Sequence, residues 1–131
     1  MNVGISYARN PLVCVIDADC VLDKDALYNA VKHFQSDEVL AVGGRLIVKQ
    51  EYSSLLETIQ SCEYMKIFQL SRSLFAMLNA QCLISGAFGV FNKSALFEIN
   101  GYDIDTVWED MELILRLQEQ CFHQSKKTDY L

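Results

Sequence analysis

Residues 12–19 read Leu12-Val13-Cys14-Val15-Ile16-Asp17-Ala18-Asp19, and they indicate the type of fold more clearly than any other stretch. The first five residues form a continuous apolar run of strand length, which is typical of a strand buried on both faces in a parallel sheet. Two aspartates follow where the strand ends. Because ligands in open α/β sheets bind at the carboxyl ends of strands, these carboxylates are well placed for chemistry. The stretch therefore predicts an α/β fold with a polar site at the end of this strand.

Helical and extended patterns alternate on both sides of that strand. Further strands are predicted at residues 39–42 and 90–91. Residues 3–8 read as the end of a helix or a short amphipathic turn, and helices are predicted at 24–35, 53–79, 93–99 and 108–120. Asn100-Gly101 is a typical signal for the end of a helix.

Hydrophobic spacing also predicts which helix faces are buried. The helix at 24–35, with Asp23 as its expected N-cap, has an apolar face made of Leu27, Ala30, Val31 and Phe34. The corresponding face of the helix at 108–120 is expected to contain Met111, Leu115 and either Leu117 or Gln118.

The composition fits one globular domain that covers residues 1–131. Hydrophobic residues make up 51% of the chain and charged residues 21%, which is ordinary for a globular protein of this size. The formal net charge of -6 gives a surface that repels phosphate backbones, and this argues against general nucleic-acid binding. Such a surface can still surround a nucleotide when a divalent cation bridges the like charges.

The cysteine pattern and the hydropathy bear on the compartment. The chain has 5 cysteines and no Cys-x-x-Cys pair, which argues against a disulfide framework and against a structural zinc site. This usage indicates a reducing, cytoplasmic-facing environment. Neither a signal peptide nor an apolar run near the ~20 residues of a membrane helix is visible. The chain itself is expected to be soluble, whether or not a longer protein carries membrane segments.

Asp17 and Asp19 are the sharpest local feature. Alternating carboxylates on an extended chain can converge on one hard cation where the backbone bends, and Mg²⁺ is typically held by few carboxylates plus phosphate oxygens. Such an ion neutralises the charge that grows on a leaving diphosphate. The structural alternative is that both aspartates cap the next helix or fill a turn. An EF-hand fits poorly, because its sixth position would be Leu22 instead of Gly and its twelfth Tyr28 instead of Glu.

Two other segments are candidates for a site. Glu109-Asp110 opens a predicted helix, where the helix dipole stabilises carboxylates. It is either an ordinary acidic first turn or a general base aimed at a substrate hydroxyl. Ser85-Gly86 opens a run of small residues whose backbone amides can approach a ligand. Alone, this run reads as a tight turn into a strand, and it is not a P-loop because no Gly-Lys-Ser/Thr follows.

Taken together, these segments resemble the family 2 glycosyltransferases. The matching stretches are residues 13–22 for the D-x-D strand end, 84–91 for the acceptor-side strand, and Asn100-Gly101-Tyr102, 109–113 and Arg116-Leu117 for the E-D base motif. Their order and spacing agree across almost the whole chain. The greatest similarity is to the processive, membrane-associated synthases of poly-N-acetylglucosamine, cellulose and hyaluronan. The resemblance implies a partial GT-A fold, that is, a Rossmann-like mixed sheet flanked by helices.

The resemblance implies a role for each matching residue. Asp17 would contact the ribose or metal side of the nucleotide sugar, and Asp19 would hold Mg²⁺ or Mn²⁺ on the diphosphate. Asp110 would be the catalytic base, with Glu109 shaping the acceptor site and Ser85-Gly86 lining a sugar pocket. The implied reaction is a single displacement with inversion. The acceptor hydroxyl loses its proton and attacks the anomeric carbon, and a nucleoside diphosphate departs. The expected donor is a UDP-sugar, so the expected leaving group is UDP.

Two departures from the family pattern lead to further expectations. The family begins with a strand-helix-strand unit that binds the nucleotide base, whereas this chain starts just before the D-x-D strand. Its processive members also carry a Q-x-x-R-W motif and membrane helices after the E-D helix, and the chain stops at Leu131 without them. The sequence is therefore expected to be a fragment of a bacterial polysaccharide-forming enzyme from the cytoplasmic face of the cell membrane. Alone it is expected to be inactive, and its open sheet edge favours self-association.

Two other classes of protein are compatible with these residues. A nucleotidyltransferase of similar architecture also holds a metal with aspartates, although the glycine-rich basic loop of that class is not visible in the sequence. A non-catalytic binding module is the second alternative.

Overall fold

The computed structural model of the chain describes residues 1–35, 38–45, 47, 55–64, 84, 87–103, 105–124 and 127–130. Four strands form one mixed sheet in the order β1-β3-β2-β4. These strands are β1 (Leu12–Ile16), β2 (Val39–Gly43), β3 (Phe88–Asn92) and β4 (Lys127–Tyr130). β3 runs antiparallel to both β1 and β2, and β4 runs parallel to β2. Ile16 lies opposite Phe88, so the end of β1 that leads to the two aspartates lies beside the beginning of β3.

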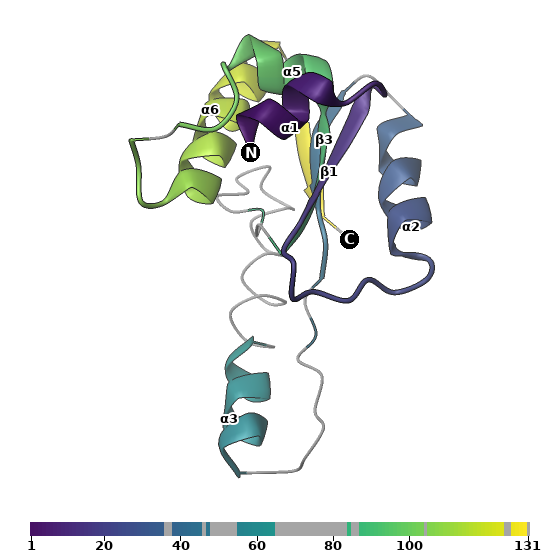
Figure 1. Cartoon of the computed structure of the whole chain (residues 1–131), viewed down its shortest axis with the longest axis vertical. Coiled ribbons are helices and arrows are strands. Elements are labelled where there is room, and N and C mark those ends of the chain that lie inside the picture. The colour runs from purple at the N-terminus through teal and green to yellow at the C-terminus, as the bar shows by residue number, and fades with distance from the viewer. Residues whose placement is uncertain are drawn as a thin grey trace.

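Helices cover both faces of this sheet. The described helices are α1 (Asn2–Tyr7), α2 (Ala26–Lys32) with the 3-10 turn η1 (His33–Gln35), α3 (Leu55–Tyr64), α5 (Lys93–Glu98) and α6 (Glu109–Gln124), and all of them except α3 lie on the sheet (Figure 1). Figure 1 shows α2 on one face, α1, α5 and α6 together on the other, and α3 projecting away from the sheet. None of the described helices is both long and apolar enough to cross a bilayer.

Two hydrophobic clusters hold the helices on the sheet. The larger lies between the sheet and α1, α5 and α6, and its fully buried members include Leu96, Leu113 and Leu117. The smaller lies under α2, where Ala30 packs in one cluster with Phe88 and other strand residues. Each sheet face therefore has its own core, as expected for a layered α/β structure.

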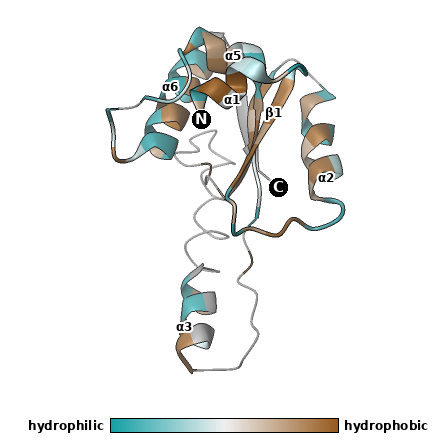
Figure 2. Ribbon diagram, viewed as in Figure 1, coloured by the Kyte–Doolittle hydropathy of each residue, from teal (hydrophilic) through white to brown (hydrophobic). Residues whose placement is uncertain are grey.

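β1 packs against both cores, but its strand neighbour is antiparallel, so the prediction of a parallel neighbour was wrong. Val13 and Val15 pack against the larger cluster, and Leu12 and Cys14 pack against the smaller one. Among the described strands, β3 is the sole neighbour of β1, and it is antiparallel. β1 is thus an edge strand whose residues all keep some exposure, although Figure 2 shows hydrophobic residues along its length. An apolar run reflects packing on two faces, but it carries no information on the direction of the adjacent strand.

The buried face of α6 differs from the predicted one. Four residues of α6 belong to the larger core: Leu113, Ile114, Leu117 and Cys121. Met111 and Leu115 are instead 41% and 49% exposed. Of the predicted residues only Leu117 is buried, because α6 carries apolar residues at helical spacing on two sides and the core takes just one of them.

The prediction for α2 was half correct. Ala30 is buried and Phe34 packs against the smaller core, but Leu27 and Val31 are 46% and 49% exposed. The helix begins later than expected, with Asp25 at the N-cap position. The carboxylate of Asp23 accepts a hydrogen bond from the Asp25 amide at 3.0 Å, so Asp23 stabilises the turn before the helix.

The predicted strands at 39–42 and 90–91 and the predicted helices at 93–99 and 108–120 are confirmed by β2, β3, α5 and α6. The helix predicted at 53–79 is confirmed over α3, and the rest of that range is outside the described residues. β4 was not predicted. Asn100 and Gly101 end α5 with positive φ angles of 63° and 69°, which confirms the expected helix stop.

Candidate active site

Asp17 and Asp19 lie in the turn that follows β1. The amide of Cys20 donates a hydrogen bond to the carbonyl oxygen of Asp17 at 3.1 Å, so the backbone bends where the sequence predicted a site. Both aspartates are exposed, and ligand atoms of Asp17, Asp19 and Cys20 all lie within 4.8 Å of one another. The structure thus brings the two carboxylates together, and three side chains can reach one cation.

Cys20, which was not predicted as a site residue, lies beside this pair. Partial burial and the charges of Asp19 and Asp17, together with a hydrogen bond to Asp19, raise the pKa of the Cys20 thiol. The thiolate is the form that binds metals, and the shift disfavours it at neutral pH. The carboxylate oxygens are therefore the available ligands, and oxygen ligands suit hard ions such as Mg²⁺ and Mn²⁺.

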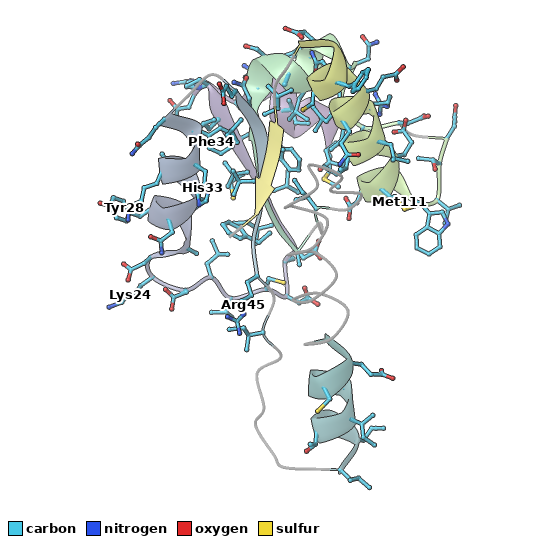
Figure 3. The ribbon with its side chains drawn as sticks, turned by 180° about the vertical axis from the view of Figure 1, so that it is seen from behind. Lys24, Tyr28, His33, Phe34, Arg45 and Met111 are labelled. Carbon is cyan, nitrogen blue, oxygen red and sulfur yellow. The ribbon has the colours of Figure 1, made fainter. Side chains whose placement is uncertain are left out.

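A cavity of about 510 Å³ opens beside Asp19. Its volume lies in the range typical of small-molecule sites. The loop after β1, α2, the chain that follows β2 and the start of β3 all contribute to its wall. Its polar lining residues are Asp19, Asp23, Asn29 and Arg45, and its apolar ones include Leu22, Ala26 and Phe88. Figure 3 shows Arg45 at the end of the sheet, where the loop between β1 and α2 passes. The carboxylates of Asp19 and Asp23, the guanidinium of Arg45 and several apolar side chains thus line one opening.

Glu109 and Asp110 form the first turn of α6. Glu109 is exposed and Asp110 is partly buried. The amide of Glu112 donates to the carbonyl oxygen of Trp108 at 3.0 Å and closes this turn. A carboxylate in such a position is stabilised by the helix dipole, and the partial burial of Asp110 suits a group that must accept a proton from a bound hydroxyl.

Tyr102 is buried next to these carboxylates. Burial, and then the charges of Asp110 and Glu109, raise the pKa of the Tyr102 phenol well above its ordinary value. The ring is 5% exposed and belongs to the larger core. The first turn of α6 therefore rests near a phenol that stays protonated.

Hydrogen bonds from two distant residues fix the turn that leads into Tyr102. Arg116 of α6 donates to the carbonyl oxygens of Ile99 and Gly101 and also pairs with Glu112. Asn2 of α1 forms two hydrogen bonds with the backbone of Tyr102. Arg116 belongs to the motif recognised in the sequence, but nothing in the sequence near Asn2 indicates a link to a residue 100 positions away.

Of the other predicted site residues, Ser85 and Gly86 lie outside the described residues. The next two residues, Ala87 and Phe88, line the cavity beside Asp19. Arg45 was not predicted, although it follows Gly43-Gly44 at the end of a strand, which is the kind of position that identified the aspartates.

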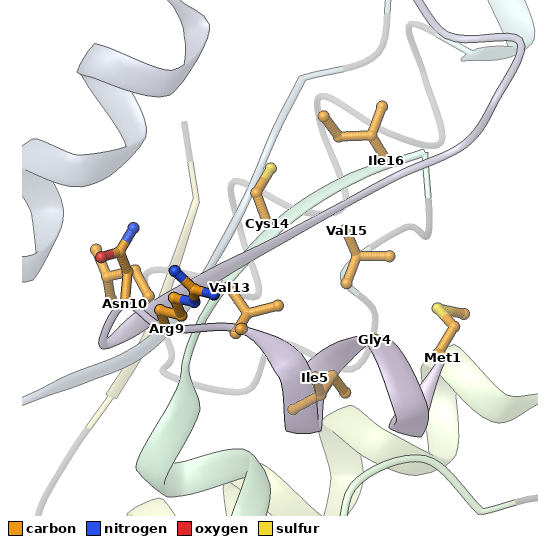
Figure 4. A pocket seen from close by; sticks show the side chains of 11 residues that line it. Met1, Gly4, Ile5, Arg9, Asn10, Val13, Cys14, Val15 and Ile16 are labelled. Atoms are coloured by element: carbon orange, nitrogen blue, oxygen red, sulfur yellow. The ribbon is translucent and has the colours of Figure 1, made fainter.

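A second cavity, of about 460 Å³, lies between α1 and β1. Figure 4 shows Ile5 from α1 and Val13 and Val15 from β1 around it. Its other lining residues are Met1 and residues of α1, the following turn and β1, and Asp17 and Asp19 are not among them. It marks the outer edge of β1 and is separate from the chemistry at the strand end.

Comparison with known proteins gives consistent matches. The family described as glycosyl transferase family group 2 matches residues 12–125. The poly-beta-1,6-N-acetyl-D-glucosamine synthase of Staphylococcus aureus strain COL is 33% identical over 118 residues, and that of a Staphylococcus epidermidis strain is 34% identical over 118 residues. Each alignment covers 89% of this chain and 28% of the relative. The chain thus spans little more than a quarter of the relatives that it matches.

Among solved structures, a mannosyltransferase from Pyrobaculum calidifontis, determined in complex with GDP-Man and Mn²⁺, has a TM-score of 0.61 to this chain. The superposition covers 98% of this chain and 32% of the mannosyltransferase, at 17% sequence identity. At this identity the likeness concerns the fold. It confirms the predicted partial GT-A architecture, in which a mixed sheet is flanked by helices.

Proposed function

Because the chain belongs to glycosyl transferase family group 2, we propose that residues 1–131 form the central and acceptor-side part of its catalytic domain. The proposed reaction moves a sugar from a nucleotide-diphosphate sugar to a hydroxyl group of a glycan. The observation that carries this proposal is the convergence of ligand atoms from Asp17 and Asp19 at the end of β1, beside a cavity of ligand size. In open α/β sheets this is the end at which ligands bind.

Asp17 and Asp19 are proposed to hold a divalent cation, with Asp17 also reaching the ribose side of the nucleotide. Their exposed oxygen atoms fit Mg²⁺ or Mn²⁺, each of which takes few carboxylates together with phosphate oxygens and water. When bound, such an ion supplies electrostatic stabilisation of the leaving diphosphate. The mannosyltransferase of similar fold was solved with Mn²⁺ and a nucleotide sugar, which supports this assignment.

Asp110 is proposed as the general base that removes the proton from the acceptor hydroxyl. Its partial burial at the start of α6 keeps water from competing fully for the carboxylate, so that a bound hydroxyl can hydrogen-bond to it. Direct attack by that hydroxyl on the anomeric carbon inverts the configuration there. The exposed Glu109 is proposed to shape the acceptor side, and Ser85 and Gly86 to line the sugar pocket.

The properties of the whole protein are part of the same proposal. The relatives are poly-N-acetylglucosamine synthases, which supports a UDP-sugar donor and a growing polysaccharide acceptor at the cytoplasmic face of the bacterial membrane. For the chain by itself we propose no efficient turnover, and association of copies through the outer edge of β1, an apolar strand with a strand neighbour on one side among the described residues.

Cation binding tests the aspartate pair directly. Calorimetry or electron paramagnetic resonance of Mn²⁺ with the chain, with and without UDP, should show binding that weakens by at least about tenfold in Asp17→Asn and Asp19→Asn, because each removes a charged ligand. Asp105→Asn is the matched control, since Asp105 is equally exposed but lies in the loop before α6. Equal Mn²⁺ affinity in all four proteins would contradict the metal site.

Transfer is best measured in a chimera in which this chain replaces the matching segment of the S. aureus synthase. We expect release of a nucleoside diphosphate that falls by about 10²- to 10⁴-fold in Asp110→Asn, the usual contribution of a general base. Unchanged turnover in that variant would remove Asp110 from the mechanism. Release of pyrophosphate instead would identify a nucleotidyltransferase.

A further inference from the structure

We infer that Asn2 and Arg116 are positioning residues for Asp110, because together they clamp the turn at residues 99–102: Arg116 ties it to the first turn of α6, and Asn2 ties it to α1. The inference rests on the proposed role of Asp110 as the base, and it assigns a task to two side chains that are not themselves placed at the reacting atoms.

Arg116 forms the first half of this clamp. Its Nη2 donates to the carbonyl oxygen of Gly101 at 2.8 Å, and its Nη1 donates to the carbonyl oxygen of Ile99. The same guanidinium donates to both carboxylate oxygens of Glu112 at 2.5 Å. Glu112 lies in the first turn of α6, and the side chains of Arg116 and Glu112 are only 28% and 29% exposed. A planar, partly buried fork of charge-assisted bonds therefore ties the turn to the start of the helix.

Asn2 forms the second half. Its Nδ2 donates to the carbonyl oxygen of Tyr102 at 2.7 Å, and its Oδ1 accepts from the amide of Tyr102 at 2.8 Å. A short amide side chain provides one donor and one acceptor in the same plane, so Asn2 pairs with Tyr102 as a neighbouring strand would. The backbone of Tyr102 is thereby fixed to α1.

The fixed turn holds Tyr102, a buried residue whose phenol lies within electrostatic range of Asp110. Tyr102 is 5% exposed, and the carboxylates of Asp110 and Glu109 are near enough to contribute to the raised pKa of its phenol. A displacement of the turn therefore changes the surroundings of Asp110, whether it starts at Arg116 or at Asn2. Small displacements of a catalytic group matter, because a misplacement of about 1 Å can lower a rate by about 10²-fold.

Nuclear magnetic resonance of the chain tests the clamp without any need for turnover. We expect Asn2→Ala and Arg116→Lys both to move the side-chain carboxyl signal of Asp110 and to speed hydrogen exchange of the Tyr102 amide. Arg116→Lys keeps the charge but loses the planar fork. The matched controls are Lys24→Gln, which removes a largely exposed ion pair with Asp25, and Glu119→Gln on the exposed side of α6. An Asp110 signal that stays in place in both clamp variants would overturn the inference.

Kinetics in the chimera give the functional readout. With all variants folded at the assay temperature, we expect kcat to fall by about 10²-fold in Asn2→Ala and Arg116→Lys, with the KM for the nucleotide sugar unchanged. A kcat that follows only the loss of folded protein would reduce both residues to a purely structural role and overturn the inference. If the chimera with the unsubstituted chain releases no nucleoside diphosphate, the proposed function fails, and the Asp110 signal still decides for or against the clamp.

Discussion

At Gly101 the chain has no room for a side chain. Its φ angle is 69°, and a Cβ atom there would lie 2.6 Å from Oδ1 of Asn2. We expect Gly101→Ala to lower the free energy of unfolding by about 1–3 kcal/mol, from backbone strain and the displaced Asn2. Gly4→Ala is the control, because a Cβ at Gly4 meets nothing within 4 Å and alanine favours the helix by about 0.5–1 kcal/mol. Urea unfolding measures both, and equal effects would contradict the crowding at Gly101.

Tyr102 makes the free energy of unfolding depend on pH in the alkaline range. The pKa of its phenol is raised in the folded protein by burial and by the charges of Asp110 and Glu109, whereas in the unfolded chain it ionises near pH ~10. The stabilisation is therefore complete below pH ~10 and is lost as the pH rises above it, because the unfolded chain releases the proton first. Tyr102→Phe should flatten the fall of the free energy of unfolding between about pH 9 and about pH 11. Tyr7→Phe, at an 81% exposed position, should leave it as steep as before.

Single residues differ in how far the sequence could predict them. Asp17 and Asp19 follow an apolar run, so their place at a strand end and their proximity could be inferred from neighbouring residues alone. The link between Asn2 and Tyr102 could not, because it spans 100 residues and depends on how α1 packs beside α5 and α6. Arg45 reaches the cavity of Asp19 because β1 and β2, on opposite sides of β3, both end beside the beginning of β3.

Within α6, burial separates two leucines of the same helix. Leu117 is fully buried, whereas Leu115 is 49% exposed. We expect Leu117→Ala to lower the free energy of unfolding by about 2–5 kcal/mol through lost burial and a cavity, and Leu115→Ala to lower it by less than about 1 kcal/mol. Chemical denaturation of both variants measures the difference. If Leu115→Ala destabilised the chain as much as Leu117→Ala, the result would contradict the observed burial and favour the face predicted from hydrophobic spacing.

The N-cap of α5 gives a second test on a single helix. The side-chain oxygen of Asn92 accepts hydrogen bonds from the amides of Ser94 and Ala95 at 2.9 and 3.4 Å. Asn92→Ala leaves both amides without this acceptor and should lower the free energy of unfolding by about 1 kcal/mol. Asn92→Asp keeps the acceptor and should retain most of the stability. A variant with alanine as stable as the one with aspartate would contradict a capping role.

Helices and strands were predicted well where the sequence has a periodic or continuous apolar pattern. They were predicted poorly where the outcome depends on which strands pair. β1, β2, β3, α5 and α6 follow from apolar runs, helix spacing and the Asn100-Gly101 stop. Neither the edge position of β1 nor its antiparallel pairing with β3 could be predicted, because both depend on the path of the chain between the two strands. β4 was missed because Lys-Thr-Asp-Tyr lacks an apolar pattern, and its pairing with β2 comes from the backbone.

At the scale of the whole molecule, β1 is an edge of the sheet among the described strands, and its residues all keep some exposure. Such an edge, apolar and free of charged residues, is a template for pairing with another chain. We expect the chain to associate as its concentration rises, and Ile16→Lys, at a position 41% exposed on the strand, to weaken that association because a charge resists burial against another strand. Val3→Lys, at a 71% exposed position on α1, should not. Sedimentation velocity over a range of concentrations distinguishes them, and a monomer at every concentration would contradict edge pairing.

The pairing of Asn2 with Tyr102 also bears on how the protein is made. The ribosome adds about 5–20 residues per second, so Asn2 waits on the order of 5–20 s for a partner that is 100 residues away. β1 waits for β3 during most of that time, with its apolar edge open on both sides. Slow translation between these two strands lengthens the time during which β1 can pair with another chain instead. Because Asp17 and Asp19 follow the end of β1, which pairs with the beginning of β3, the speed of synthesis between the two strands affects how soon their turn is held in place.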